Sequence, residues 1–473
     1  MLDINPESTM ADLPSDGVLL HPTVPPVPSH LQLDLTEQQS DAIRKLQAFV
    51  QPTCLEKFLL IAGFPGVGKS TVMVYAIQEL QSLKLEFVLT ATTNKAVNVL
   101  SKMASRIGLQ VPCMTIHQFL GLKLVKRQGE KVLEKGASDF ALLNYFSGKQ
   151  SIVFVDECSM INEALWNFLV QETQRSYLAP KFVLMGDPFQ LNPVNEGRSP
   201  SFKVTNKIIL NQVVRQAAHN PLLTVLKECR TAIRQKIPFE PQTRVTADKQ
   251  QGLLKTSQKT LVKYAQKLVI EDFDTNSDRF RILCWTNKRV DFYNTILRCH
   301  RYGHDAPQFV VNERLISTES VVAPNKKDII LNAATEMVVT GIEEQLHESY
   351  RAYRLTVMPE GYPSARQIFV LHEADQERFD SETEQLLQSA RRSPVLWRKY
   401  YEHLETFAQV RPCFALTVHA SQGRTFEEVA IDADDLRKRL RDGTQERLTE
   451  YNRLWTVALS RAQRRVLFCR EDG

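Results

Sequence analysis

The chain has 473 residues, too many for one hydrophobic core, because single cores stop growing near ~250–300 residues; we therefore expect at least two domains. Its net charge of +5 and its 43% of apolar residues are typical of a globular protein, and they permit a polyanionic partner without requiring one. No apolar run approaches the ~20 residues of a membrane span, so no membrane contact is expected. The absence of a secretory signal and of any CxxC pair among the eight cysteines favours a cytoplasmic protein with reduced thiols.

A segment of alternating strands and helices follows the N-terminal region. Residues 1–34 are rich in proline and serine, which predicts a disordered or extended tail. Residues 35–205 contain short apolar runs separated by helical patterns, and the expected strands are Phe58–Ala62, Phe87–Thr90, Ile152–Val155 and Phe182–Met185. This alternation predicts an α/β domain, with a parallel sheet covered by helices on both faces and ligands bound at the carboxyl ends of its strands.

A second α/β segment, residues 206–308 and 411–473, is interrupted by an insertion. Its expected strands are Arg281–Trp285, Cys413–Val418 and Val466–Cys469. The insertion, residues 309–410, begins as an antiparallel β module with expected strands at Phe309–Val311, Met337–Thr340 and Arg354–Met358. It continues as a charged amphipathic helical stretch over residues 372–408.

A glycine-rich loop after the first expected strand fits the pattern G-x4-G-K-S/T. Its glycines let the backbone wrap around phosphate oxygens, whose negative charge then faces a helix N-terminus. Lys69 would reach the β- and γ-phosphates, and Ser70 would ligate Mg²⁺. The residues expected to bind the nucleotide are Gly63, Pro65, Gly66, Val67, Gly68, Lys69, Ser70 and Thr71.

Two acids at the end of the strand Ile152–Val155 complete this site. Asp156 would hold the Mg²⁺ ion, and Glu157 would orient or deprotonate the attacking water. The alternative is an exposed acidic turn, which is disfavoured because unpaired charge at the end of a buried strand is costly. The two motifs together predict a nucleoside triphosphatase.

Further motifs, in order along the chain, resemble those of superfamily 1 helicases, most closely the SF1B RecD-like branch and the phage Dda-type helicases within it. The matching segments are Leu35–Ala42 (Q motif), Gly63–Ser70 (I), Thr90–Val97 (Ia), Thr115–His117 (Ib), Asp156–Glu157 (II), Gly186–Val194 (III), Asn211–Gln216 (IV), Ala415–Gly423 (V) and Trp455–Ala462 (VI). The resemblance implies two RecA-like P-loop NTPase domains, with ATP and Mg²⁺ as cofactors. It also implies that Gln39 recognises adenine and that Gln190 senses the γ-phosphate.

Two arginines of the second α/β segment complete the predicted chemistry. Charge on the γ-phosphate in the transition state is commonly stabilised by an arginine from a second domain, and the first segment has no obvious arginine beside its phosphates. Arg215 and Arg461 are the candidates, so hydrolysis would require the two domains to close on each other. For both residues an exposed surface arginine is the alternative. Val214 precedes Arg215 where many relatives have a tyrosine that stacks on the base.

Short polar residues in motifs Ia, Ib and V are suited to phosphate and sugar contacts. They are Thr92, Thr93, Asn94, His117, Thr417, His419 and Ser421. The segment Gly121–Lys135 predicts a β-hairpin that turns at Gln128–Gly129, and it resembles the strand-separating pin of the family, domain 1B at about residues 119–138. Its strands carry no aromatic residue, so a wedge of lysine and aliphatic side chains is expected there. Residues 309–410 resemble domain 2B, an SH3-like module with a helical extension.

The resemblance implies an ATP-dependent helicase that moves 5′→3′ along single-stranded DNA and unwinds duplex junctions. Its expected partners include single-strand binding proteins and replication or recombination proteins, in the host cytoplasm if a phage encodes the chain. Two alternatives stay open. One is an RNA helicase of the same superfamily, and the other is an ATP-gated single-strand binding or loading protein that does not unwind.

Overall fold

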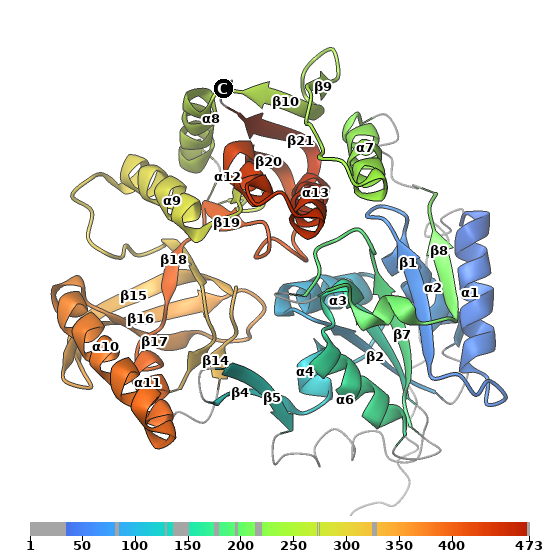
Figure 1. Ribbon diagram of the computed structural model, residues 1–473, viewed down its shortest axis with the longest axis horizontal. Helices are drawn as coiled ribbons and strands as arrows, with labels where there is room; N and C mark the ends of the chain where they lie inside the picture. The colour runs from blue at the N-terminus through green and yellow to red at the C-terminus, as the bar shows by residue number, and fades with distance from the viewer. Residues whose placement is uncertain are drawn as a thin grey trace, which may run out of the picture. The chain divides into compact units, whose positions relative to one another are not determined.

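The computed structural model (Figure 1) describes residues 35–80, 85–127, 130–135, 151–174, 179–193, 197–212, 220–271, 273, 275–323 and 329–470, with the side chains of 123–127, 130–132 and 394 left out. The chain divides into two units, Met1–Leu35 and Thr36–Gly473, and all the described helices and strands belong to the second. The expected tail, the turn Gln128–Gly129, Val214 and Arg215 lie outside the described residues.

The first lobe is built on a parallel six-stranded sheet with the order β3-β2-β6-β7-β1-β8. The strands are β1 (Phe58–Gly63), β2 (Glu86–Ala91), β3 (Cys113–Thr115), β6 (Ser151–Asp156), β7 (Lys181–Gly186) and β8 (Lys207–Leu210). The helices are α1 (Glu37–Val50), α2 (Lys69–Leu80), α3 (Asn94–Arg106), α4 (Ile116–Phe119) and α6 (Glu163–Thr173), with short 3-10 turns at Cys158–Met160 and Pro200–Lys203. The inner strands are buried along almost their whole length, as parallel strands are when helices cover both faces. All four strands expected from the sequence are present.

The boundary between the two α/β segments lies later than predicted. Residues 206–210 were assigned to the second segment, but β8 pairs in parallel with β1, with Ile61 opposite Ile208. The sequence could not reveal this pairing, because a short edge strand has the same apolar pattern in either sheet. The first lobe therefore extends at least to Leu210.

A β-hairpin leaves the first lobe directly after α4. Strands β4 (Leu122–Arg127) and β5 (Glu130–Lys135) pair antiparallel, from Leu122 opposite Lys135 to Arg127 opposite Glu130. The predicted hairpin is thus present, and it contacts the helical part of the insertion through β4.

The second lobe has a six-stranded sheet with the order β19-β11-β20-β21-β10-β9, parallel except for β9. Its strands are β9 (Arg244–Val245), β10 (Gly252–Thr256), β11 (Phe280–Cys284), β19 (Ala415–Thr417), β20 (Phe426–Asp432) and β21 (Ala462–Cys469). Its helices are α7 (Leu222–Gln235), α8 (Gln258–Glu271), α9 (Asn287–Tyr302), α12 (Ala433–Arg437) and α13 (Gln445–Ser460), with a 3-10 turn at Lys438–Leu440. The fully buried Trp455 packs against Phe239 and Phe468 in the core of this lobe.

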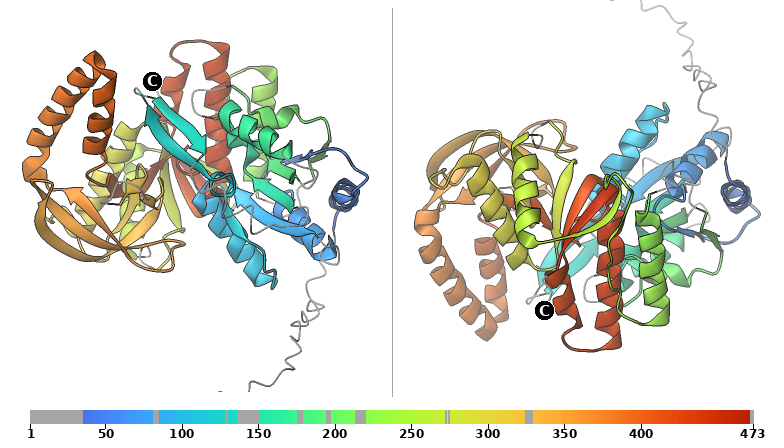
Figure 2. Two further views of the ribbon diagram at one scale, coloured as in Figure 1. Left: turned by 90° about the horizontal axis from the view of Figure 1, so that it is seen from below. Right: turned by 90° about the horizontal axis from the view of Figure 1, so that it is seen from above.

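The insertion combines an antiparallel sheet with a pair of helices. The five-stranded sheet has the order β17-β16-β15-β12-β18, and a two-stranded ribbon lies beside it. The strands are β12 (Arg314–Ser317), β13 (Val321–Val322), β14 (Ile329–Leu331), β15 (Glu336–His347), β16 (Tyr350–Pro359), β17 (Arg366–Leu371) and β18 (Val410–Pro412). Helices α10 (Gln376–Arg392) and α11 (Trp397–Leu404) lie side by side, as Figure 2 shows, with 3-10 turns at Glu373–Asp375 and Pro394–Leu396.

One expected strand of the insertion was wrong. Phe309–Val311 is not a strand but leads into a turn, in which Asn312 has a left-handed φ of +68°. The buried carboxylate of Glu313 accepts a hydrogen bond from the backbone N–H of Val310 at 3.1 Å, which holds the turn. The apolar side chain of Phe309 is explained by packing, since its ring lies edge-on against Tyr353, and not by a place in the sheet.

Candidate nucleotide site and nucleic-acid interface

The glycine-rich loop joins β1 to α2 at the carboxyl edge of the first sheet. Gly66 and Gly68 have left-handed φ values of +86° and +82°, which favour glycine. A Cβ on Gly68 would lie 2.2 Å from Nε2 of Gln39, so no larger residue fits there without displacing that side chain. The loop therefore has the tight turn and the following helix N-terminus that anion binding requires.

Lys69 is the first residue of α2, and its side chain folds back across the loop. Its ammonium group donates hydrogen bonds to the carbonyl oxygens of Gly63 at 2.9 Å and of Phe64 at 3.2 Å. Because both acceptors belong to the loop itself, the positive charge is held within the curl of backbone that would surround phosphate. Ser70 and Thr71 follow in the first turn of α2.

Gln39 contacts the same loop from the other side. It lies in the first turn of α1, where Thr36 and Gln39 form a reciprocal capping box. Its buried side-chain amide donates a hydrogen bond to the carbonyl of Val67 at 3.1 Å. The structure thus brings Gln39 to the nucleotide loop, and its recognition of adenine stays a prediction.

Asp156 and Glu157 lie at the carboxyl end of β6. Glu157 has a left-handed φ of +54°, an uncommon conformation for a residue with a side chain, and its backbone N–H donates to the carboxylate of Asp156 at 2.9 Å. Burial raises the pKa of both carboxyl groups. For Asp156 the positive charge of Lys69 opposes this increase. For Glu157 the negative charge of Asp156 adds to it, while Arg461 and Lys69 oppose it.

Arg461 ends α13 in the second lobe and is only 5% exposed, so the alternative of a surface arginine is wrong. Its guanidinium donates from Nη1 to the carbonyl of Arg424 at 3.1 Å and from Nη2 to Ser460 Oγ at 3.0 Å. Its positive charge opposes the increase in the pKa of Glu157 that burial causes. Arg215, the other candidate, lies outside the described residues.

The loop after β7 carries Asp187 and Gln190, and both side chains are buried. Asp187 Oδ1 accepts a hydrogen bond from the backbone N–H of Phe189 at 2.9 Å. Among the described residues, Asp187 Oδ2 and Gln190 Oε1 have no hydrogen-bond partner. Gln190 therefore has a buried acceptor oxygen, Oε1, that receives no hydrogen bond from any described residue.

All the candidate DNA-contacting residues except His117, which lies in α4, belong to two segments that approach each other. Thr93 caps α3 in the first lobe, and a Cβ built on Gly423 of the second lobe would lie 3.3 Å from its Oγ1. Thr92 donates to Met160 Sδ at 3.5 Å, and Thr417 Oγ1 accepts from the backbone N–H of Ala420 at 3.1 Å. Asn94 begins α3 beside them.

Three of these candidates have properties that the sequence did not indicate. His117 and His419 are half-buried, and burial lowers the pKa of each imidazole below its ordinary value. The prediction that Ser421 contacts DNA is not supported by its position. This residue is fully buried, and its hydroxyl donates to the carbonyl of Val418 at 2.7 Å, so it stabilises the loop from inside.

Known proteins match this chain either in part or over most of its length. A family model described as an AAA domain matches residues 34–247. The chain is 28% identical over 205 residues to the ATP-dependent RecD2 DNA helicase of Deinococcus radiodurans, covering 42% of this chain and 24% of that protein. It is 23% identical over 474 residues to the uncharacterized protein R530 of Acanthamoeba polyphaga mimivirus, covering 85% of this chain and 94% of that one. A solved structure of Pif1 helicases, described as unwinding forked duplex DNA, matches 92% of each chain with a TM-score of 0.50 and 16% identity.

The chain is thus similar in sequence to the RecD2 helicase and in fold to Pif1 helicases. Its fold is that of two RecA-like P-loop domains with insertions, as the sequence predicted. It spans 24% of the length of the RecD2 helicase. The finer assignment to the Dda-type branch stays a prediction. Within the described residues, no helix combines the length and the apolar character that a membrane span requires.

Sequence reasoning missed two arginines of the second lobe that contact the site. Arg453 on α13 donates from Nη1 to the backbone carbonyl of Gln190, and Arg230 on α7 lies beside Asp187. Arg230 is one of the buried residues of α7, together with Leu226 and Cys229. The only sign of this in the sequence is a charged residue on the apolar face of a helix, which does not indicate the group that the residue contacts.

Proposed function

We propose that this chain is an ATP-dependent DNA helicase that couples closure of its two lobes to movement along single-stranded DNA, with 5′→3′ polarity, and to duplex unwinding. The observation that carries the proposal is the contact of second-lobe arginines with the loop after β7 in the first lobe: Arg453 Nη1 donates to the carbonyl of Gln190, and Arg230 Nη2 lies 3.8 Å from Asp187 Oδ2. A site that takes charged groups from both lobes is complete only when the lobes are together. The names of the RecD2 and Pif1 relatives agree with this activity.

The residues of the loop and of β6 fit Mg²⁺. Carboxylate and hydroxyl oxygens are the ligands that this cation prefers, and the buried carboxyl group of Asp156 gains from a nearby positive charge because burial disfavours its ionised form. We assign Ser70 and Asp156 to the metal. When bound, Mg²⁺ would supply charge neutralisation on the β- and γ-phosphates.

Three further side chains then have roles in hydrolysis. Glu157, with a pKa raised by burial, accepts the proton of the attacking water. Gln190 has a buried Oε1 without a hydrogen-bond partner among the described residues, so it can accept a hydrogen bond from that water and orient it. Arg461 stabilises the charge that develops on the γ-phosphate.

The contact between motifs Ia and V links this chemistry to DNA. Thr93 and Gly423, one from each lobe, lie against each other where a strand would cross between the lobes. A change in the distance between the lobes during the ATP cycle would change the spacing of the two strand contacts, and this is how we propose that the enzyme steps.

Lys69→Ala tests the site. We expect ATP turnover to be abolished and single-stranded DNA binding to be retained, whereas Lys203→Ala, which removes an exposed lysine of the same lobe, should leave both unchanged. Arg461→Ala should lower kcat by about 10³-fold with little change in nucleotide affinity. Undiminished hydrolysis by Lys69→Ala would overturn the assignment of the site.

Substrate and direction are tested with oligonucleotides. ATPase activity should be stimulated by single-stranded DNA more than by RNA of the same sequence, and a duplex with a 5′ tail should be unwound. Stronger stimulation by RNA would favour an RNA helicase. Stimulated hydrolysis without unwinding would favour an ATP-gated binding or loading protein, and unwinding solely from a 3′ tail would refute the proposed polarity.

A further inference from the structure

A buried arginine of the second lobe lies on the nucleotide loop of the first. Arg230, on α7, is 6% exposed, and its guanidinium carbon is 3.9 Å from the centroid of the Phe64 ring, the second residue of the loop. Its Nη2 lies 3.8 Å from Oδ2 of Asp187, beyond hydrogen-bond distance. One side chain of the second lobe thus meets both loops that would surround the γ-phosphate.

The hydrogen-bonding groups around this arginine are incomplete. Among the described residues, Nε and Nη2 of Arg230, Oδ2 of Asp187 and Oε1 of Gln190 are buried without a hydrogen-bond partner. Buried polar atoms are nearly always satisfied, so several of them together indicate a site whose partners arrive with a ligand or with a change of conformation. Burial lowers the pKa of Arg230 and the nearby Asp187 opposes this, but a guanidinium stays charged at neutral pH.

The aromatic ring under Arg230 belongs to the loop that would bind phosphate. Phe64 is flanked by Phe189, with ring centroids 5.9 Å apart, so the two loops are joined by their rings as well. The backbone carbonyl of Phe64 accepts a hydrogen bond from Lys69. A displacement of Phe64 would therefore also move the carbonyl group that accepts the hydrogen bond from the Lys69 ammonium.

Two arginines of the second lobe contact the loop after β7, one near each end of the loop. Arg230 lies at Asp187, and Arg453 donates to the carbonyl of Gln190. Burial lowers the pKa of Arg453 to about 10. Movement of α7 and α13 relative to the first sheet must therefore move the loop that carries Gln190, or break these contacts.

We propose that Arg230 is a positioning residue through which the second lobe responds to a nucleoside triphosphate in the loop of the first. Before the nucleotide binds, its guanidinium rests on Phe64. When the triphosphate fills the loop, Phe64 and Lys69 shift, and Arg230 closes the gap to Asp187, which fixes the orientation of Gln190. This inference rests on the proposed ATPase activity, and it assigns to Arg230 a role distinct from that of Arg461, which would meet the phosphate itself.

A double-mutant cycle on Arg230 and Phe64 tests this. Arg230→Met should lower the DNA-stimulated kcat about tenfold or more, as loss of one desolvated cation–π contact would, while KM for ATP stays within about twofold. Phe64→Leu should have a similar effect, and the double variant should be no worse than the worse single variant. Phe64→Tyr, which keeps the ring, should retain activity. Arg234→Met is the matched control, because Arg234 lies one turn along the same helix, is exposed, and is 5.2 Å from the Phe189 ring.

A second measurement does not depend on turnover. Hydrogen exchange in α7 should slow when a non-hydrolysable ATP analogue is added to the wild type, and this slowing should be lost in Arg230→Met. Wild-type kcat in Arg230→Met, additive effects in the double variant, or unchanged exchange behaviour would each overturn the inference. A fall in kcat that only follows a fall in Tm would do so too, because it would indicate a purely structural role. Failure of the wild type itself to hydrolyse ATP would instead refute the proposed function, and the exchange measurement would still decide on Arg230.

Discussion

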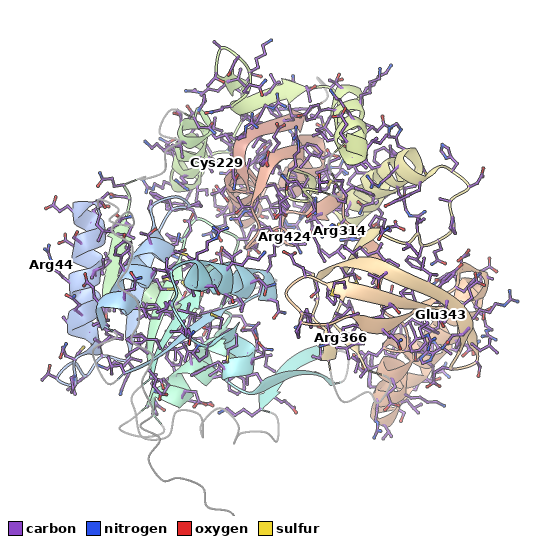
Figure 3. All side chains as sticks on the ribbon, turned by 180° about the vertical axis from the view of Figure 1, so that it is seen from behind. Arg44, Cys229, Arg314, Glu343, Arg366 and Arg424 are labelled. Carbon is purple, nitrogen blue, oxygen red and sulfur yellow. The ribbon has the colours of Figure 1, made fainter. Side chains whose placement is uncertain are left out.

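Replacing Glu336 with glutamine is expected to destabilise the junction between the second lobe and the insertion more than any surface change. Glu336 begins β15 and is 2% exposed. Its Oε2 accepts a hydrogen bond from Arg281 Nη2 at 3.0 Å, its Oε1 pairs with Arg424, and Arg314 lies 4.0 Å away. Figure 3 shows Arg424 and Arg314 approaching this junction from the second lobe and from the insertion.

The magnitude follows from the pKa of Glu336. Burial alone would raise it, but Arg281 and Arg424 outweigh burial and lower it from the ordinary 4.5 to about 2. A difference of roughly 2.5 pKa units corresponds to about 3 kcal/mol of folding stability. Breaking a buried ion pair by removing one partner costs a similar amount, ~3–5 kcal/mol. If the unit Thr36–Gly473 unfolds as a whole, 3 kcal/mol lowers Tm by about 3 °C, because the entropy of unfolding near Tm is about 2.1 cal/mol/K per residue.

The dependence on pH has a definite sign. Because the folded-state pKa is lowered, the stabilisation is fully present above about pH 4.5 and is lost as pH falls toward 2. At pH 3 about half of it should remain, so the difference in stability between wild type and Glu336→Gln should narrow between pH 5 and pH 3.

Thermal unfolding followed by tryptophan fluorescence is a suitable assay, since the fully buried Trp455 reports on the second lobe. Glu343→Gln is the matched control. Glu343 lies on the same strand, but its pair with Arg354 is at the surface, where such pairs contribute ~0–1 kcal/mol. Equal Tm values for wild type and Glu336→Gln at pH 7, or a difference that persists undiminished at pH 3, would refute the reasoning.

Three further predictions concern other parts of the chain. Gly361→Ala should lower Tm, because φ is +81° and the new Cβ would lie 2.0 Å from the Asn98 side chain; adding Asn98→Ala should recover the part due to the clash but not the part due to the backbone. Native-state labelling with iodoacetamide at pH 8, mapped by mass spectrometry, should spare Cys158, since burial raises its pKa to about 12. Lys181→Met should cost ~2–4 kcal/mol in urea unfolding, because the buried ammonium donates to three backbone carbonyls around the end of α1, and a preserved midpoint would contradict this.

The parts of the molecule that the sequence predicted are those in which local pattern and position agree. Strands β1, β2, β6 and β7 are short apolar runs, each followed directly by the polar or glycine residues of a motif. The resemblance to superfamily 1B helicases follows from motifs in a fixed order, and a RecD2 helicase is among the proteins that match the chain. The strand β20 was not predicted, because its sequence FEEVAID places two acids in the first half of a buried strand. Glu428 is tolerated there because Arg465 pairs with it at 2.8 Å, a partner that lies in another strand.

The contacts between the lobes could not be predicted in the same way. The hydrogen bond from Arg453 to Gln190 joins residues that are 263 positions apart, and no local pattern connects them. The same holds for Arg230 and Phe64, whose contact depends on how two separate sheets meet. From the sequence we did predict that an arginine of the second α/β segment acts on the nucleotide bound by the first, because charge on the γ-phosphate in the transition state is commonly stabilised by an arginine from a second domain. It could not indicate which further arginines the interface would bury.

The position of Arg461 has a consequence for how the insertion and the nucleotide site are connected. Arg461 Nη1 donates to the backbone carbonyl of Arg424, and the side chain of Arg424 pairs with Glu336 of the insertion. Arg424, the residue directly after motif V, therefore contacts the candidate catalytic arginine with its backbone and the insertion with its side chain. A displacement of Arg461 would therefore disturb the insertion unless its hydrogen bond to Arg424 or the ion pair of Arg424 with Glu336 breaks. The contacts of Glu336 thus stabilise the fold and also connect the insertion to the segment that contacts Arg461.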